Sequence, residues 1–349
     1  MSTDDQEKKK KKTAHTPGYL ELEDIPSALD KANELWTNVG KTDLYSTGLP
    51  ILDDYLGGGF GSKKSGELIL IHSTSKTYKS TFSWQMVKTA LERGEKLGLI
   101  ILEGRLPESL VTLKQLYAPV QKGDKVVGYE RFDKLMENVV KNKQLISLSR
   151  KFLENEFEIK EITDWMMMQK LAGVSLFLID PIGYVADYAH SNEPSYKLES
   201  KLMKQLSNFV YDTCSTVICI QHNVKDGDYL NPAHRQAAIG GSQSFSKSPT
   251  KVIELRNEGP INAEDPKGGK LISLEMYMAR SVRDWRGYPV ILQVISHPDG
   301  KGRFFSMIKY DEEEGNVILN GRDGKKNKDS RGLWFGQVKG DLEELVNDL

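Results

Sequence analysis

The chain has 349 residues, 38% of them hydrophobic, and a formal net charge of −1. This length holds one large α/β domain with extensions or two small domains, and we expect one main domain around a buried core. The near-neutral charge neither demands nor excludes nucleic acid as a partner. No apolar run is long enough to span a bilayer and the N-terminus is polar, so we expect a soluble cytoplasmic protein with no membrane partner. The two cysteines, Cys214 and Cys219, lack zinc-ligand spacing, which favours a reducing compartment and argues against structural zinc.

The two ends of the chain differ in composition from its middle. Residues 1–18 contain a lysine run at 8–12 and too few apolar residues to offset chain entropy, which predicts a flexible basic tail. Such a tail is either a solvated arm or a weak binder of phosphate backbones. Residues 19–43 form a lead-in in which 25–36 have the spacing of a short amphipathic helix, packed on this core or on a neighbouring subunit. Residues 311–349 are rich in Gly, Lys and Asp and acidic at their end, which predicts a loosely attached acidic extension.

Between these ends, segments with the pattern of strands and helices alternate. The expected strands are 67–72, 97–102, 175–179 and 216–221, and the expected helices are 80–91, 108–116 and 196–211. A charged stretch, 130–172, is expected to be helical. The later strands 252–255, 271–278, 289–295 and 303–308 are expected to form hairpins. The predicted fold class is α/β, with a mainly parallel twisted sheet flanked by helices and a C-terminal β-hairpin extension.

The segment 67–81, ELILIHSTSKTYKST, has the layout of a phosphate-binding loop: an apolar strand, a short polar loop and a helix opened by Lys79 and Ser80. Backbone N–H groups of such a loop and the helix N-terminus attract phosphate oxygens. The spacing fits GxxxxGK[ST], but Ser73 and Tyr78 stand where the pattern has glycines, and a Lys-Ser pair after a strand also occurs by chance. We expect an ATP site with Mg²⁺, in which Lys79 reaches the β/γ oxygens and Ser80 holds the metal. The expected nucleotide contacts of the loop are Ser73, Thr74, Ser75, Lys76, Thr77, Tyr78, Lys79, Ser80 and Thr81.

Polar side chains follow three other apolar strands. Glu103 follows the second strand, where a carboxylate could orient or deprotonate an attacking water. Asp180 ends FLID, the place of a second Mg²⁺ ligand, and Gln221 and His222 end VICIQH, where they could hydrogen-bond a γ-phosphate. Each residue alone also fits a structural role, as a turn cap or a strand-end histidine. Their occurrence in this order favours a nucleotide site.

These residues resemble the RecA-like P-loop ATPases, which include hexameric replicative helicases and filament-forming recombinases. The segment 47–59, TGLPILDDYLGGG, is similar to the lead-in before the phosphate loop in that family, and the resemblance covers residues 44–310. The aromatic before the lysine is similar to the loops of phage-type recombinases, whereas Ser73 remains a departure. The resemblance implies that Glu103 is the catalytic glutamate, Asp180 the second nucleotide-binding motif and His222 a phosphate sensor.

The resemblance also implies a DNA-facing loop and an arginine supplied to the neighbouring subunit. The loop spans 223–248 and offers glycines for close backbone approach and polar groups for sequence-neutral phosphate contacts. Its candidate residues are Lys225, His234, Arg235, Gly240, Gly241, Gln243, Ser244 and Lys247. In MARSVRDWRG, residues 278–287, Arg280 and Arg283 are the candidates for the arginine in trans, and Arg286 is a further one. An ordinary surface loop and a solvated arginine-rich hairpin are the alternatives.

The resulting hypothesis is an ATP-dependent motor that binds single-stranded DNA, acts in DNA replication or recombination and assembles as a homo-oligomer, a hexameric ring or a filament. A ring-forming DNA helicase is favoured by His222, the loop after it and the late arginine-bearing strand. A filament-forming recombinase that promotes strand exchange is favoured by the residue types of the phosphate loop. A non-hydrolysing scaffold is the third possibility, against which the retained Lys79, Ser80, Glu103 and Asp180 argue. Replication or recombination proteins would be further partners.

Overall fold

The computed structural model describes residues 43–74, 77–117, 120–122, 125–127, 129–148, 158–189, 193–223, 239, 244–260, 269–279, 290–296, 303–310, 317–319, 322–328 and 334–337. The chain divides into two compact units, Met1–Lys41 and Thr42–Leu349, and all described residues belong to the second. The predicted basic tail and the predicted helix at 25–36 lie outside the described residues. No helix in the described ranges combines the length and apolar character needed to cross a membrane.

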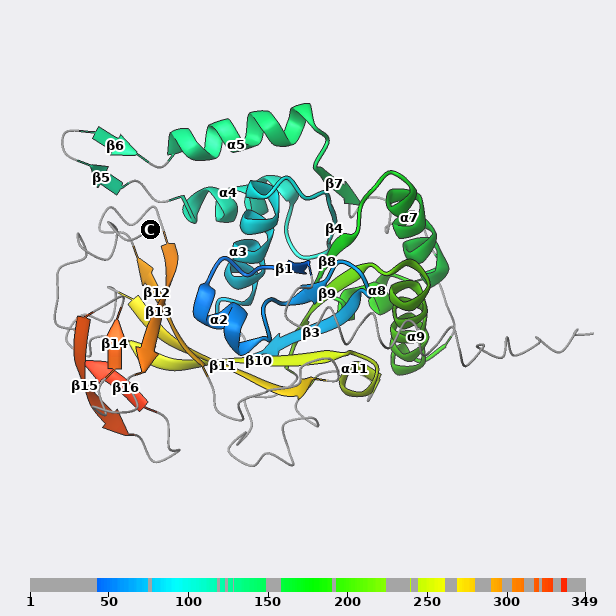
Figure 1. Ribbon diagram of the computed structural model, residues 1–349. Coiled ribbons are helices and arrows are strands. Elements are labelled where there is room, and N and C mark those ends of the chain that lie inside the picture. Colours follow the sequence, from blue (N-terminus) through cyan, green and yellow to red (C-terminus); the bar gives the residue numbers. More distant parts are fainter. Residues whose placement is uncertain are drawn as a thin grey trace, which may run out of the picture. The chain divides into compact units, whose positions relative to one another are not determined.

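One large sheet organises the described residues. Its strand order is β16-β15-β14-β13-β12-β11-β10-β3-β9-β8-β4-β7. The strands are β3 (Glu67–Ser73), β4 (Leu97–Ile101), β7 (Leu145–Leu148), β8 (Leu176–Asp180), β9 (Thr216–His222), β10 (Lys251–Pro260), β11 (Gly269–Ala279), β12 (Val290–Ser296), β13 (Arg303–Tyr310), β14 (Val317–Leu319), β15 (Arg322–Lys328) and β16 (Trp334–Gln337). From β10 to β7 all neighbours are parallel, and from β10 to β16 all are antiparallel. The predicted α/β class, a parallel core continued by C-terminal hairpins, is confirmed (Figure 1).

Helices cover both faces of the parallel part of the sheet. The helices are α2 (Pro50–Tyr55), α3 (Lys79–Glu92), α4 (Leu106–Gln115), α5 (Tyr129–Lys141), α7 (Ile159–Leu171), α8 (Gly183–Tyr188), α9 (Ser195–Thr213) and α11 (Ser244–Lys247). All side chains of β3 are buried, as expected for a parallel strand covered on both faces. Because side chains alternate along a strand, Ile69 and Ile71 join one hydrophobic cluster and Leu68 and Leu70 join the other.

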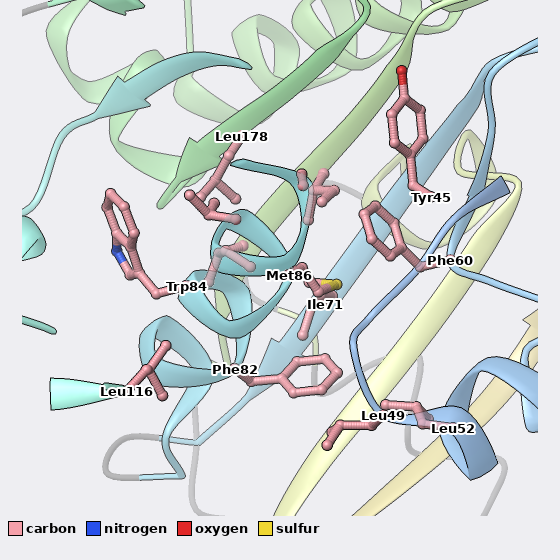
Figure 2. Close-up of a cluster of buried hydrophobic side chains, with 14 of the residues drawn as sticks. Tyr45, Leu49, Leu52, Phe60, Ile71, Phe82, Trp84, Met86, Leu116 and Leu178 are labelled. Atoms are coloured by element: carbon pink, nitrogen blue, oxygen red, sulfur yellow. The ribbon is translucent and has the colours of Figure 1, made fainter. Parts of the chain in front are cut away.

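The first cluster packs α3, α4 and α5 on one face of the sheet. Figure 2 shows Phe82 and Met86 of α3 in this cluster together with Ile71 of β3 and Phe60 of the lead-in. The second cluster packs α7 and α9 on the opposite face, with Leu202 and other apolar side chains of α9 fully buried. The apolar periods of these elements, 2 for strands and 3.6 for helices, explain why the predicted central strands and helices are confirmed to within a few residues.

The stretch 130–172 differs from its prediction as a helical region. It is interrupted by β7, which pairs in parallel with β4 and adds an edge strand, Leu145 lying opposite Leu97. β7 has only four residues, LISL, a length at which period 2 and period 3.6 cannot be told apart. The prediction was wrong here because a tertiary contact, pairing with β4, decides the local structure. Two short strand pairs also escaped prediction, namely β1 (Leu44–Tyr45) with β2 (Gly61–Ser62) and β5 (Val120–Lys122) with β6 (Lys125–Val127).

The lead-in segment TGLPILDDYLGGG docks on α3. Its turn is held by Asp53, whose Oδ1 accepts hydrogen bonds of 2.7 Å from both the backbone N and the Oγ1 of Thr47. The carbonyl of Thr47 in turn accepts a hydrogen bond of 3.2 Å from the hydroxyl of Thr89 on α3. Gly48 permits this approach, because at its φ of +80° a Cβ atom would lie 2.2 Å from the Thr89 Oγ1. The lead-in therefore fixes the helix that follows the phosphate loop.

A buried ion pair fastens the opposite end of β3. The ammonium of Lys251 on β10 lies 3.0 Å from the Oε2 of Glu67, and the two side chains are 3% and 6% exposed. The same ammonium donates a hydrogen bond of 3.3 Å to the carbonyl of Phe60. Since two buried charges with good geometry compensate each other but either alone is costly, this pair ties β3, β10 and the lead-in into one unit.

Candidate functional site

The candidate site lies at the edge of the sheet where the parallel strands end. Ser73 is the last residue of β3 and lies opposite His222, the last residue of β9. Asp180 is the last residue of β8 and lies opposite Ile101, the last residue of β4. Carboxyl ends of parallel strands form the usual ligand-binding edge of an open α/β sheet. The predicted polar residues are therefore gathered at one edge although they are far apart in sequence.

The phosphate loop leads from β3 into α3 through Tyr78. Tyr78 is the N-cap of α3 and has φ 61° and ψ 26°, the left-handed conformation that favours glycine. Its side chain is half-buried and packs against the first hydrophobic cluster. A non-glycine residue in this conformation costs about 1 kcal/mol, which the ring's packing offsets. The backbone at Tyr78 thus has a left-handed conformation of the kind that favours glycine, the residue that GxxxxGK[ST] has at this position.

Hydroxyl groups stabilise the first half of this loop. Ser73 and Thr77 are buried, and their side-chain oxygens are joined by a hydrogen bond. Each of the two hydroxyl oxygens also lies 3.0 Å from the carbonyl oxygen of Thr74; because each hydroxyl has one hydrogen, the pair makes two of these three bonds at a time. Ser73, which stands in place of a glycine, therefore closes the loop by side-chain contacts. Ser75 and Lys76 lie outside the described residues.

Lys79 opens α3 and is 5% exposed. Its ammonium donates hydrogen bonds to the carbonyl oxygens of Thr74, at 2.7 Å, and Ser73, at 3.2 Å. Burial lowers the pKa of Lys79 to about 8, against the opposing attraction of the Asp180 and Glu103 carboxylates. A charged group is thus held inside the loop next to two acidic side chains.

Ser80 and Asp180 meet beside Lys79. Desolvation raises the pKa of Asp180 to about 6; Ser80 lowers it through a side-chain hydrogen bond, and the charge of Glu103 raises it. Ser80 lies in the first turn of α3 and Asp180 at the tip of β8, so two different elements bring these oxygen ligands together. A hydroxyl and a carboxylate are oxygen donors of the kind that Mg²⁺ prefers.

Glu103 and His222 form a second pair at the same edge. The Nε2 of His222 lies 3.1 Å from the Oε2 of Glu103, and the side chains are 41% and 57% exposed. Glu103 follows β4 and His222 ends β9, so this contact crosses over β8, which lies between the two strands. The pair leaves a carboxylate accessible to solvent and oriented by a histidine, as a group that activates water requires.

The side chain of Gln221 has a partner within the fold, and its role at a γ-phosphate stays a prediction. It is buried, and its Oε1 accepts a hydrogen bond of 3.0 Å from the backbone N of Gly183, the first residue of α8. Successive side chains of a strand point to opposite faces, so Gln221 and His222 do not share a direction. The structure places the Gln221 side chain under the turn that follows Asp180, where it supports that turn.

The other predicted site residues fall mainly outside the described residues. These are Lys225, His234, Arg235, Gly240, Gly241 and Gln243 of the expected DNA-facing loop, and Arg280, Arg283 and Arg286 after β11. Ser244 and Lys247 are described and lie in α11. The hydroxyl of Ser244 donates a hydrogen bond of 2.8 Å to the Oγ of Ser200 on α9, and Lys247 is exposed. Their roles toward DNA stay predictions.

Two residues at this edge were not singled out from the sequence. His72, in β3, is completely buried, and its Nδ1 lies 2.8 Å from the Oδ1 of Asn223, directly after His222. The signal available in the sequence was a histidine inside an otherwise apolar strand, which is unusual unless the ring has a polar partner. The partner itself, 151 residues away, could not be read from the sequence.

The residues at this edge fit a magnesium nucleotide. Lys79 would contact the β/γ-phosphates, Ser80 and Asp180 would hold Mg²⁺, and the N-terminus of α3 would add its partial positive charge. In the described ranges no group of three or more His, Cys, Asp or Glu side chains could hold a metal ion. A site with one serine and one carboxylate is instead typical of Mg²⁺, which is bound by few protein ligands together with substrate phosphates.

Comparisons of structure gave similar proteins, whereas comparisons of sequence did not. No protein-family model matches the chain, and no curated protein matches it. The solved structure of the ATPase domain of G40P is 12% identical, with a TM-score of 0.59 over 81% of this chain and 98% of that chain. The KaiC-like protein PH0186 from the hyperthermophilic archaeon Pyrococcus horikoshii is 16% identical, with a TM-score of 0.50 over 76% of this chain and 99% of that chain. At these identities the likeness lies in the fold.

The left-handed conformation of Tyr78 gives a first prediction. Tyr78→Gly and Tyr78→Ala both remove the ring, but only glycine adopts φ 61° without strain. We expect the glycine variant to be more stable than the alanine variant by about 1 kcal/mol, measured by urea unfolding. Equal stability of the two variants, or a more stable alanine variant, would show that the helix does not begin in this conformation.

The raised pKa of Asp180 gives a second prediction. Between the unfolded pKa of 3.8 and the folded value of about 6, the folded protein keeps a proton on Asp180 that the unfolded chain has lost. Raising the pH through this interval therefore favours unfolding. As the pH rises through this interval, we expect the free energy of unfolding of the wild type to fall, relative to that of Asp180→Asn, by on the order of 1 kcal/mol or more. Urea unfolding of both proteins at several pH values measures this, and a constant difference would contradict it.

Proposed function

We propose that this chain, which has the fold of the RecA-like P-loop ATPases, is a DNA-dependent ATPase that binds ATP with Mg²⁺ and acts as a motor on single-stranded DNA. The observation that carries the proposal is the cluster at the carboxyl edge of the sheet. There the buried ammonium of Lys79 lies in the field of Asp180 and Glu103. A cation, a metal-ligand pair and an accessible carboxylate are the three parts that phosphoryl transfer to water requires.

Each residue of the cluster has a distinct task in this proposal. Lys79 would leave the loop carbonyls to bind the β/γ-phosphate oxygens, and Ser80 and Asp180 would hold Mg²⁺, whose charge would offset that of the phosphates. Glu103 accepts a proton from the attacking water. His222, 3.1 Å from Glu103, orients that carboxylate and senses the γ-phosphate.

Single-stranded DNA is the proposed polymer. The segment after His222 carries Lys225, Arg235 and Lys247 among glycines and polar residues, a composition suited to sequence-neutral contacts with a phosphodiester chain. Arg280 or Arg283 is proposed to reach the site of an adjacent subunit, so that hydrolysis depends on assembly. Such an arginine is worth about 10³–10⁵ in rate in other phosphoryl-transfer enzymes.

A ring-forming DNA helicase is the form that we propose for this motor. Three features that follow one another along the chain support this form: a histidine at the end of a strand, a loop with glycine and basic residues, and a strand in the C-terminal part that leads to arginines. A filament-forming recombinase is the second candidate, because the serine- and aromatic-containing phosphate loop favours it. A non-hydrolysing scaffold is the least supported candidate, since the chain retains Lys79, Ser80, Glu103 and Asp180. Asp180 accepts a hydrogen bond from Ser80 and interacts electrostatically with Lys79 and Glu103.

Hydrolysis with and without DNA tests the proposal. We expect ATP hydrolysis to rise on addition of single-stranded DNA, and Lys79→Ala to reduce the stimulated rate by about 100-fold or more, because it removes a cation that stabilises transition-state charge. Lys204→Ala, which removes a charge from the exposed face of α9, is the matched control and should leave the rate unchanged. Unchanged hydrolysis in Lys79→Ala would place the site elsewhere.

Electron microscopy distinguishes the two assembled forms. With single-stranded DNA and a slowly hydrolysed ATP analogue, we expect closed rings, the assembly in which a strand passes through a central channel. Long helical filaments on the DNA would instead support the recombinase. Monomers under all conditions would exclude both assembled forms, along with an arginine acting in trans.

A further inference from the structure

Asp180 lies at the point where β8 leaves its ladder with β9. Regular pairing of these two strands ends one residue earlier, with Ile179 opposite Cys219. On the other side, toward β4, the carbonyl of Asp180 still accepts a hydrogen bond of 2.9 Å from the backbone N of Leu102. The position of Asp180 relative to β9 therefore depends on the turn that follows it.

Two consecutive residues near the end of β9 hold this turn. The backbone N of Ile182 donates a hydrogen bond of 2.8 Å to the carbonyl of Ile220. The backbone N of Gly183 donates a hydrogen bond of 3.0 Å to the side-chain Oε1 of Gln221. The first bond joins two backbone groups, whereas the second ends on a side chain. A substitution at Gln221 can therefore remove the second bond and leave the first in place.

The amide of Gln221 fits closely against Gly183. A Cβ atom added to Gly183 would lie 2.9 Å from the Oε1 and 3.1 Å from the Nε2 of Gln221, closer than most Cβ contacts in proteins. The Gln221 side chain is buried, so its amide has little room to move aside. The glycine and the buried amide together therefore set how closely the turn after Asp180 approaches the end of β9.

A magnesium ion requires its oxygen ligands at closely defined positions. Mg²⁺ demands near-octahedral geometry with ligand distances of about 2.0–2.1 Å, and the groups that orient metal ligands typically change metal affinity by about 10–100-fold. Ser80 lies in the first turn of α3 and hydrogen-bonds the side chain of Asp180. A shift of the turn after Asp180 would move one of these two oxygen donors relative to the other.

We propose that Gln221 is a positioning residue of the magnesium site, whose amide oxygen holds Gly183 and thereby keeps the Asp180 carboxylate beside Ser80. The inference rests on the proposed function, in which Ser80 and Asp180 hold Mg²⁺ together with ATP. It deepens that function by assigning Gln221 a role toward the metal. This role differs from a contact with the γ-phosphate, because it affects every nucleotide that binds with Mg²⁺ and none that binds without it.

Titration calorimetry with ATPγS and with ADP, each in Mg²⁺ and in EDTA, tests this role without using hydrolysis as the readout. Gln221→Met nearly keeps the length of the side chain and removes the acceptor of the Gly183 bond. We expect Mg²⁺ to tighten the binding of both nucleotides to the wild type, and this tightening to be about tenfold smaller in Gln221→Met. In EDTA we expect the variant to bind each nucleotide within about twofold of the wild-type affinity, because no metal then takes part.

Further variants separate positioning of the metal ligand from general support of the fold. In an Asp180→Asn background, which lacks the metal-binding carboxylate, Gln221→Met should cause no further loss of the Mg²⁺ effect. Gly183→Ala acts on the same contact from the other side, and it should reproduce the loss even if Gln221→Met fails to fold. Gln144→Met is the matched control, because Gln144 is also buried but precedes β7, at the opposite edge of the sheet. It should bind both nucleotides as the wild type does.

The possible outcomes are distinct. An undiminished Mg²⁺ effect in Gln221→Met overturns the inference, and so does weaker binding of both nucleotides in EDTA. A loss confined to ATPγS and present in EDTA also overturns it, because Gln221 would then contact the γ-phosphate. An equal loss in the Asp180→Asn background would show that Gln221 does not act through Asp180. A wild type that binds neither nucleotide refutes the proposed function, whereas one that binds both equally with and without Mg²⁺ refutes the metal site and the inference.

Discussion

The buried ammonium of Lys79 is the group on which the rest of the site depends. A lysine with 5% exposure would be strongly disfavoured as a cation without partners, so the fold surrounds it with loop carbonyls and with two carboxylates. The carbonyls come from the end of β3, and the carboxylates from the ends of β8 and β4. The ends of three strands, β3, β8 and β4, therefore surround this one positive charge.

The same constraint explains why both faces of the sheet are sealed. A low-dielectric surrounding strengthens the attraction between Lys79 and Asp180, but only while water is kept from the strands below them. The two hydrophobic clusters do this, one under α3 and the other under α9, with alternate residues of β3 belonging to each. The Glu67–Lys251 pair closes the far end of β3 in a similar way, by matching one buried charge with another.

Much of this arrangement could be predicted from the sequence, for identifiable reasons. Asp180 and His222 each stand at the end of a mainly apolar strand. The end of a buried strand can be recognised in the sequence because the spacing of the apolar residues and the polarity change at about the same position. Lys79 and Ser80 were found because they open a helix after such a strand. By contrast, β7 has four residues and forms because β4 offers an edge, so its pairing is decided by a tertiary contact that no local pattern contains.

Side-chain partners were the part that the sequence could not supply. Gln221 is predicted to bind a γ-phosphate because it is a polar residue at the tip of a buried strand, but the direction of a strand-end side chain depends on which face the neighbouring elements leave open. The partner that its Oε1 has in the fold, the backbone N of Gly183 in α8, could not be read from the sequence. His72 and Asn223 meet across 151 residues, a contact that follows from the register of β3 and β9 and from nothing local. The register itself is set by packing on both faces of the sheet.

The backbone of Tyr78 has a consequence for how phosphate loops are found in other proteins. A glycine at this position is a means to a dihedral angle, and here a tyrosine reaches the same angle with its ring packed on the core. Searches that score residue identity penalise such a loop at its most characteristic position. A comparison of torsion angles at the start of the helix would rank it beside its glycine-containing counterparts.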